Sequence, residues 1–302
     1  MKIITLTLNP AFDIHCNAEN FTAERENIAD ITSKCTGGKG INISRALAKC
    51  GIKNTAFVVL GNENAEEFCK KTDLSNIDLK TVTVDGRIRE NITVHTKGRP
   101  ETRISFTGFK ANDTIIDEIS EELFKTVCSD DVVVLSGRLP VGVSIGTVKN
   151  MLTQLRKKGI KTVIDSQSFT PDDLLECRPF LIKPNQEEIA SYCKTENFSD
   201  VASKLHKNGI ENVMVSLGKD GALLVCNDGI FTAKPPKIQA VSTIGAGDSM
   251  IAGFLSALLL KKSSKECLIN AVAFGTAKCL KDGTNPPRIE DIERIKSEIE
   301  VK

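Results

Sequence analysis

The second half of the chain alternates short apolar segments with longer amphipathic ones. Segments rich in Val, Ile and Leu predict strands, and the segments between them have the residue spacing of helices. We expect strands at residues 132–135, 162–164, 180–182 and 213–216, and helices at 144–158, 171–177, 186–193 and 201–207. Because neighbouring parallel strands need a crossover connection, this alternation favours βαβ units. It predicts a Rossmann-like α/β fold with a doubly wound, mainly parallel sheet.

The remaining segments extend this architecture and add one insertion. We expect strands at 2–8 and 55–60, helices at 63–71 and 113–127, a hairpin at 222–233, and C-terminal helices at 248–261, 265–280 and 289–299. Residues 81–106 alternate apolar and polar side chains, as antiparallel strands with one solvated face do, and residues 17–35 do so more weakly. We therefore expect a single domain over residues 1–302, with a small β lid inserted from about 12–36 and 87–108.

Charge and cysteine content argue against several classes of partner. The chain has 40 Lys and Arg against 39 Asp and Glu, for a net charge of +1. Binding to nucleic acids or anionic membranes draws on an excess of basic residues, so neither is expected. The ten cysteines form no C-x-x-C pair and there are three histidines, so a zinc cluster is not expected either. Scattered thiols, no signal-peptide pattern and no apolar run of ~18 residues predict a cytoplasmic protein.

A glycine-containing turn precedes the apolar segment 251–260. In it, Gly245, Ala246 and Gly247 lead into Asp248 at the expected start of a helix. Glycines let a backbone turn sharply and expose its N–H groups, and helix N-termini attract anions. The turn therefore predicts an anion site with a carboxylate base at its lip, which suits phosphoryl transfer to a hydroxyl. The alternative is that Asp248 only caps the helix.

A second glycine-rich turn precedes the helical segment 41–50. Gly37 and Gly38 come directly before Lys39, and Asn42 falls in the first helical turn. Backbone amides and an ammonium group converge there on an anion or a polyol. The spacing matches neither the nucleotide-binding P-loop nor the dinucleotide fingerprint. The alternative is an ordinary turn with a solvated lysine.

The first strand and the expected lid add further candidates for substrate binding. Asp13 follows the Asn-Pro turn after the first strand and is either a ligand for hydroxyl groups or a turn residue. Arg87, Arg89 and Arg103 project from the lid segment. Several arginines on one small sheet can clamp a phosphate, and a solvated charged face is the alternative.

Polar loops follow four of the expected parallel strands. Such loops share one edge of a parallel sheet, where ligands bind. They carry Arg138 after the first of these strands, Asp165 after the second, Lys183, Asn185 and Glu188 after the third, and Ser216, Gly218 and Gly221 after the fourth. Asn185 and Glu188 are three residues apart at a helix start, so both can face one metal-bound water network. Ordinary turn chemistry is the alternative for each loop taken singly.

Six motifs in order resemble those of the PfkB, or ribokinase-like, carbohydrate kinases. Within the family they resemble the branch of 1-phosphofructokinases and tagatose-6-phosphate kinases. They are TLNPAFD (7–13), GGKGIN (37–42), SGRLP (136–140), KPNQEE (183–188), SLGKDGA (216–222) and STIGAGDSM (242–250). The resemblance implies a single ribokinase-like kinase domain with a small β lid, acting on ATP with Mg²⁺.

The resemblance also implies residue roles. It makes Asp248 the catalytic base and the amides of Gly245, Ala246 and Gly247 the anion hole for the transferring phosphoryl group. The implied ligands of sugar hydroxyls are Asp13, Gly38 and Asn42, next to Gly37. Those of the substrate phosphate are Lys39 and Arg89. The implied ATP contacts are Lys183, Asn185, Ser216 and Gly218, with Gly221 and Thr243 in the same motifs. Asn185 and Glu188 match the feature that the family associates with magnesium.

Two departures from the family pattern concern the substrate. Arg138 stands where a small residue is usual, and the basic residue often found near position 28 is absent, with Arg25 as the candidate substitute. We expect a kinase that phosphorylates fructose 1-phosphate at its 6-hydroxyl. Tagatose-6-phosphate kinase is the alternative, followed by a free-sugar or nucleoside kinase and a non-catalytic sugar-phosphate-binding regulator. Exposed lid strands would pair two subunits into a homodimer.

Overall fold

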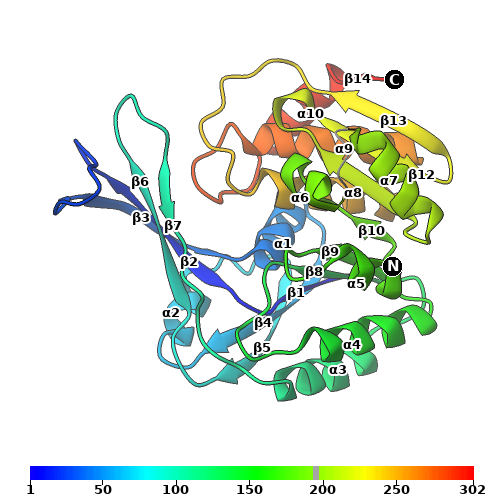
Figure 1. Ribbon diagram of the computed structural model, residues 1–302, viewed down its shortest axis with the longest axis horizontal. Coiled ribbons are helices and arrows are strands. Elements are labelled where there is room, and N and C mark those ends of the chain that lie inside the picture. The colour runs from blue at the N-terminus through cyan, green and yellow to red at the C-terminus, as the bar shows by residue number, and fades with distance from the viewer. Residues whose placement is uncertain (193–196) are drawn as a thin grey trace.

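A large mixed sheet forms the centre of the computed structural model, which describes residues 1–192 and 197–302 (Figure 1). Its strand order is β14-β13-β12-β11-β10-β9-β8-β1-β4-β5. The strands that run parallel are β1 (Ile3–Thr7), β4 (Asn54–Gly61), β5 (Ile77–Val84), β8 (Val132–Ser136), β9 (Lys161–Asp165), β10 (Leu181–Ile182) and β11 (Asn212–Ser216). The antiparallel edge consists of β12 (Ala222–Cys226), β13 (Gly229–Lys234) and β14 (Glu300–Val301).

Helices cover both faces of this sheet, as the doubly wound pattern predicts. One face packs against α1 (Lys39–Lys49), α8 (Ala246–Leu259), α9 (Ser264–Lys278) and α10 (Ile289–Ser297). The other packs against α2 (Ala65–Lys71), α3 (Thr114–Thr126), α4 (Ile145–Lys157), α5 (Pro171–Cys177), α6 (Gln186–Tyr192) and α7 (Phe198–Lys207). Along β8, Val132 and Val134 enter one core while Val133 and Leu135 enter the other. The parallel strands are therefore buried on both faces and apolar throughout.

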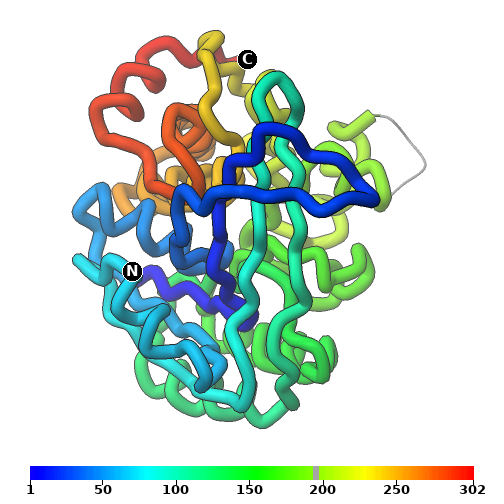
Figure 2. Tube along the Cα trace, turned by 90° about the vertical axis from the view of Figure 1, so that its left-hand side faces the viewer, coloured from blue at the N-terminus to red at the C-terminus, as the bar shows by residue number. Residues whose placement is uncertain are grey.

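A small four-stranded sheet projects from the body (Figures 1 and 2). It contains β2 (Ala11–Asn17), β3 (Asp30–Gly37), β6 (Arg89–His95) and β7 (Thr102–Ile104), in the order β3-β2-β6-β7. The expected insertion is therefore present as a separate sheet. Two details of the expectation were wrong. Residues 81–84 belong to β5 in the large sheet, and β2 pairs with β6 in parallel.

The error over residues 81–84 has a physical cause. β5 is the edge strand of the large sheet, and from residue 80 onward its partly buried positions alternate with exposed ones. An edge strand covered on one face has the same period-two pattern as an antiparallel strand, so the pattern alone does not separate them.

Aromatic and charged side chains anchor the small sheet to the body. Phe12 on β2 and Phe68 on α2 are fully buried, with ring centroids 5.6 Å apart in an edge-to-face arrangement. Lys34 on β3 lies 4.4 Å from the centroid of the Phe12 ring and pairs with Glu67 and Glu90 at 2.8 and 2.9 Å. The base of the small sheet is therefore fixed to the body, while its far end extends away from it (Figure 1).

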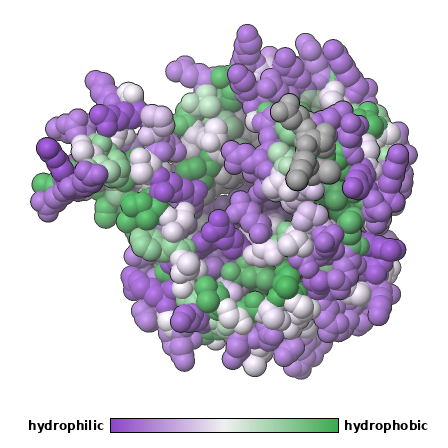
Figure 3. Space-filling view, in the orientation of Figure 1, coloured by the Kyte–Doolittle hydropathy of each residue, from purple (hydrophilic) through white to green (hydrophobic). Residues whose placement is uncertain are grey.

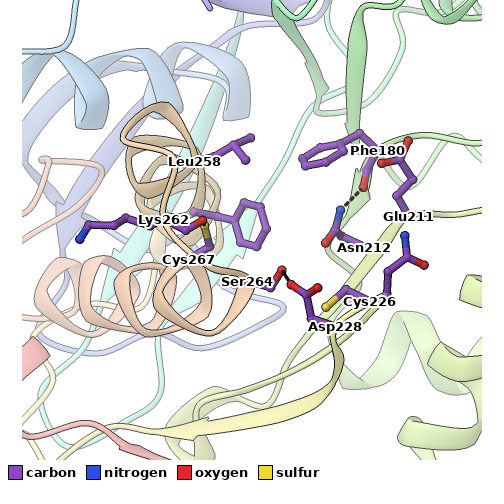
Figure 4. Close-up of a pocket in the computed structure, with 11 residues that line it drawn as sticks. Phe180, Glu211, Asn212, Cys226, Asp228, Leu258, Lys262, Ser264 and Cys267 are labelled. Atoms are coloured by element: carbon purple, nitrogen blue, oxygen red, sulfur yellow. Dashed lines mark hydrogen bonds between the residues drawn. The ribbon is translucent and has the colours of Figure 1, made fainter.

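Three further features complete the description of the fold. The expected helix over 186–193 ends at Tyr192, and Cys193 lies outside the described residues. Within the described ranges, no helix combines the length and hydrophobicity needed to cross a bilayer. A pocket of about 210 Å³ lies at the amino ends of β10 and β11, lined by Phe180, Asn212 and Cys226 among others (Figure 4). This edge is opposite to the loops that carry the candidate site residues.

Candidate active site

The turn before α8 has the conformation that an anion site needs. Gly245 is in the left-handed region at φ 79°, which favours glycine, and its carbonyl accepts a hydrogen bond from Ser249 N at 2.9 Å. The amide of Ala246 donates to Thr243 O at 3.2 Å, so it closes the turn and is not free for a ligand. No partner is found among the described residues for the amides of Gly247 and Asp248. These two N–H groups are the donors left at the start of α8.

Asp248 is buried beside this turn and contacts the second glycine-rich turn. Its Oδ2 accepts a hydrogen bond from Asn42 Nδ2 at 2.9 Å. Burial raises the pKa of Asp248 above its usual range, although Lys39 opposes this shift. The Oδ1 atom of Asn42 is buried and has no hydrogen-bond partner in the part of the chain that the structure describes. A hydroxyl group donating to that oxygen would satisfy it.

The close approach of α1 to β1 explains why Asn42 reaches Asp248. Gly38 has φ 122°, and a Cβ on Gly40 would lie 2.8 Å from the carbonyl oxygen of Leu6. Only glycine permits this approach without moving the backbone. The two glycines therefore bring the first turn of α1 against the carboxyl end of β1, next to the start of α8.

Asp165 joins Lys39, predicted to bind the substrate phosphate, and Lys183, predicted to contact ATP. Its carboxylate lies at the end of β9, 3.1 Å from Lys39 Nζ and 3.6 Å from Lys183 Nζ. Burial by itself would raise the pKa of Asp165, but Lys183 and Lys39 outweigh it and hold the pKa below its usual range. The same contacts keep the pKa of Lys39 above its ordinary value despite burial. Sequence reasoning noted this carboxylate at a strand end but did not count it among the site residues.

Lys183 brings this ion-pair group to the anion site. A Cβ on Gly247 would lie 2.9 Å from Lys183 Nζ, so the ammonium group sits directly against the Gly247 backbone. Lys183 is 5% exposed. A buried ammonium beside open amides gives a strongly positive site for a phosphoryl group.

Asp13 occupies the small sheet rather than a turn. It lies in β2 and is 4% exposed. Its Oδ1 accepts hydrogen bonds from Asn91 Nδ2 and from Arg103 Nη2, both at 3.0 Å. A Cβ on Gly37 would collide with Asp13 Oδ2, so Gly37 leaves room for that oxygen. Because Oδ2 has no hydrogen bond among the described residues, Asp13 keeps an acceptor for a hydroxyl group.

The arginines predicted to bind phosphate have different partners. Arg89 donates to the carbonyl oxygens of Asn9, Pro10 and Phe106 at 3.0–3.3 Å. Arg138 donates twice to Gln167 Oε1, at 2.9 and 3.2 Å. In the described ranges, neither guanidinium has a carboxylate within ion-pairing distance. Arg138 and Arg103 both contribute repulsion that helps to lower the pKa of Arg89, after the larger effect of burial. The charges of Arg103 and Arg138 thus both act on Arg89, and that of Asp13 opposes them.

Other predicted contacts have structural roles. Arg87 pairs with Glu90 at 3.2 Å. Asn185 Oδ1 accepts from Glu188 N at 2.8 Å, and Glu188 Oε2 accepts from Asn185 N at 2.9 Å. These reciprocal bonds form a capping box at the start of α6. The second carboxylate oxygen of Glu188 accepts from Gln167 Nε2 at 3.1 Å.

The last loop at this edge contains two glycines in different surroundings. Gly221 has φ 90°, and a Cβ there would collide with the carbonyl oxygen of Ala233, so this glycine is needed for packing against β13. Gly218 has φ 61° and faces open space within 4 Å of its Cβ position. Ser216 is tied to the neighbouring loop by a hydrogen bond from its amide to Pro184 O at 3.0 Å. Of the two glycines, Gly218 is the one with room for a ligand.

One face of the molecule has a hollow between the body and the base of the small sheet. In Figure 3 hydrophilic side chains border this hollow. The structure thus brings Asp248, Asn42, Lys39, Asp165 and Lys183 into one connected group. Asp13 and Arg103 form a second group on the small sheet.

Comparison with known proteins agrees with this arrangement. Residues 7–291 match the model of the pfkB family of carbohydrate kinases. This chain belongs to that family. It is therefore a phosphotransferase with an alcohol group as acceptor.

Relatives and solved structures cover almost all of the chain. It is 33% identical to the 1-phosphofructokinase of Escherichia coli strain K12, over 90% of this chain and 89% of that protein. It is 29% identical to a tagatose-6-phosphate kinase of Staphylococcus epidermidis, over 99% of both chains. The solved structure of phosphofructokinase-2 from Escherichia coli, in complex with substrates and products, superimposes with a TM-score of 0.90 at 28% identity, covering 98% of this chain and 99% of that one. The family and the ribokinase-like fold are thereby confirmed.

Proposed function

We propose that this kinase phosphorylates fructose 1-phosphate at its 6-hydroxyl, producing fructose 1,6-bisphosphate. The observation that supports a phosphorylated substrate is the gathering of Arg89, Arg103 and Arg138, of which only Arg103 has a carboxylate partner in the described part of the chain. Three guanidinium groups with one carboxylate among them carry a net positive charge, which a bound anion stabilises. The relatives named as 1-phosphofructokinases and as tagatose-6-phosphate kinases both support a phosphoketose.

The catalytic step follows from the surroundings of Asp248. Burial raises the pKa of this carboxyl and strengthens it as a base toward an alcohol proton. Asn42 holds one carboxylate oxygen and leaves its own Oδ1 to orient the acceptor hydroxyl. The open amides of Gly247 and Asp248, with Lys183 beside them, stabilise the charge on the phosphoryl group in transfer. Lys39, held by Asp165, lies on the side of the second glycine-rich turn and is proposed to contact the substrate phosphate.

ATP and Mg²⁺ are proposed as the phosphoryl donor and its cation. Ser216, Gly218 and Thr243 are proposed ATP contacts, together with Lys183. The capping box uses one carboxylate oxygen of Glu188. The other oxygen accepts a hydrogen bond from the Gln167 side-chain amide, and a water molecule can replace that donor. One carboxylate that binds through water fits Mg²⁺, which keeps several waters and takes its other ligands from substrate phosphates. When bound, Mg²⁺ would neutralise charge on the nucleotide phosphates.

A coupled assay with competing acceptors tests this function. Fructose 1-phosphate, fructose 6-phosphate, tagatose 6-phosphate and fructose are compared as acceptors for ATP, at matched concentrations. We expect the highest kcat/KM with fructose 1-phosphate, and far lower activity with fructose. A higher kcat/KM with tagatose 6-phosphate would refute the choice of substrate, and equal activity with fructose would refute the role of the arginine group.

We also propose that the small sheet acts as a lid and pairs two subunits. Large apolar side chains on and next to it are exposed: Ile28 at 85%, Ile31 at 68%, Phe106 at 49% and Ile104 at 45%. Apolar surface gathered on a projecting sheet favours association with a second copy. Ile31→Asp should convert the dimer to a monomer in analytical ultracentrifugation. Ile230→Asp, at a position 52% exposed on β13 of the large sheet, is the matched control and should leave the dimer intact. A wild-type chain that sediments as a monomer would refute the proposal.

A further inference from the structure

A lysine that no role above requires is buried beneath the anion site. Lys278, the last residue of α9, is 1% exposed, in the same range as the aliphatic core. Its Nζ donates one hydrogen bond, to Lys281 O at 3.2 Å. Among the residues described, no carboxylate lies within 4.0 Å of this ammonium group. Burying an unpaired charge costs several kcal/mol, as a rule, unless something compensates for it.

The position of Lys278 indicates what compensates for the cost of burying its charge. A Cβ on Gly245 would lie 3.6 Å from Lys278 Cε and 4.0 Å from Asp248 Oδ2. Lys278 and Asp248 therefore both lie close to Gly245, next to the position that a side chain there would occupy. The end of the lysine side chain lies directly against the turn whose free amides open the N-terminus of α8.

The same helix end holds the turn in place through its backbone. Cys279 O accepts hydrogen bonds from the amides of Val241 and Ser242, at 2.7 and 3.3 Å. A Cβ on Gly275 would lie 3.2 Å from Ala246 O, so α9 and the first turn of α8 are in close contact there. Because these contacts immobilise the turn relative to α9, the distance between the ammonium group and the anion site is fixed before any ligand binds.

We propose that Lys278 is a positioning residue that supplies a built-in positive charge behind the anion site, stabilising the phosphoryl group during its transfer. It contacts no substrate and acts through the Gly245 turn. The inference rests on the proposed role of that turn. Burial lowers the pKa of Lys278, with Cys279, Asp282 and Asp248 opposing the shift. An anion bound at the turn favours the charged form further.

Replacing Lys278 by methionine separates a functional charge from a structural one. Methionine has a similar length and is apolar, so Lys278→Met removes the charge and keeps the packing. If the charge serves transfer, kcat should fall on the order of 10- to 100-fold, as expected for a lost electrostatic contact at the transition state. The KM values for ATP and sugar should change less than about threefold, since ground-state contacts are untouched. The melting temperature should stay the same or rise, because a buried unpaired charge is gone.

The matched control is Lys281→Met in the following loop. Lys281 pairs with Asp291 at 3.5 Å, and its side chain is 18% exposed. The substitution therefore removes a nearby lysine charge without changing a contact of the Gly245 turn. Its kcat should equal that of the wild type. Wild-type kcat in Lys278→Met would overturn the proposal. A variant with a lowered melting temperature and raised KM values would show that Lys278 is structural, and would also overturn it.

Two further measurements do not depend on which sugar is the substrate. ADP with aluminium fluoride mimics the phosphoryl group in transfer, so Lys278→Met should weaken binding of this mixture by about the factor lost in kcat, and leave ADP alone unchanged. In Lys278→Ala, which leaves a cavity, methylammonium should restore this binding, whereas tetramethylammonium at equal ionic strength should not. Equal binding by wild type and Lys278→Met, or no effect of methylammonium, would refute the inference. A wild type inactive on all four acceptors would instead refute the proposed substrates.

Discussion

Asp165→Asn tests the idea that one buried carboxylate holds Lys39 and Lys183, the lysines proposed to contact the substrate phosphate and ATP. The Asp165 side chain is 3% exposed and has ammonium groups at 3.1 and 3.6 Å. Removing one partner of a buried ion pair typically costs about 3–5 kcal/mol. Lys183 is 6% exposed at its side chain, but Lys39 is 36% exposed, so water screens its share. We therefore expect the lower end, about 3 kcal/mol of unfolding free energy.

This loss can be measured as a shift in melting temperature. For a chain of 302 residues, an unfolding entropy of about 2 cal/mol/K per residue makes 3 kcal/mol equal to about 5 °C. Differential scanning calorimetry of wild type and Asp165→Asn gives this shift directly. The control is Asp130→Asn, which alters an exposed pair with Lys161 at 3.3 Å and should cost less than about 0.5 kcal/mol. Equal shifts in the two variants would refute the assignment.

The pH dependence of the difference adds a second check. Because Lys183 and Lys39 hold the pKa of Asp165 below its value in the unfolded chain, the stabilisation is fully present above the unfolded pKa. It is lost as the pH falls through the lower pKa of the folded state. The gap between wild type and Asp165→Asn should be constant from about pH 8 to pH 5 and shrink below about pH 4. A gap that grows on acidification would contradict this sign.

Four other substitutions test separate features of the site and the fold. Asp248→Asn should lower kcat by about two to four orders of magnitude with little change in ATP affinity, measured by steady-state kinetics and calorimetric titration, and near-wild-type turnover would exclude Asp248 as the base. Arg89→Ala should raise KM for the phosphosugar about tenfold or more and leave KM for ATP unchanged; an unchanged phosphosugar KM would remove Arg89 from substrate binding. Gly221→Ala should destabilise the fold by about 2 kcal/mol or more in urea unfolding, because its Cβ meets the Ala233 carbonyl, whereas Gly218→Ala should cost about 1 kcal/mol through its left-handed backbone alone.

The fold was predictable from the sequence where strands are buried on both faces. Continuous apolar segments such as 132–135 and 213–216 identify strands of a parallel sheet, and β8 and β11 occupy those positions. Prediction failed where burial is one-sided. Residues 81–84 look the same at the edge of the large sheet as in the small sheet, and only pairing with β4 decides between them.

The sequence identified candidate site residues better than it identified the partners that those residues contact. Glycine turns and strand-end loops located Asn42, Lys183 and Asp248, because local backbone needs are visible in sequence. The pairing of Lys39 with Asp165 joins residues 126 positions apart, and no local pattern reports such a contact. Nor does a local pattern show that the Ala246 amide donates its hydrogen bond within its own turn, to the carbonyl oxygen of Thr243.

The joint between the two sheets is short, and a residue proposed to bind substrate spans it. β1 ends at Thr7 and β2 begins at Ala11, so three residues connect the central strands of both sheets. Arg89 bridges this joint by donating to the carbonyls of Asn9 and Pro10. A sugar bound as we propose would contact both Asp13 on the small sheet and Asn42 on the body. Arg89, which we propose binds the substrate phosphate, also ties this joint, so its replacement should change both substrate binding and the position of the small sheet.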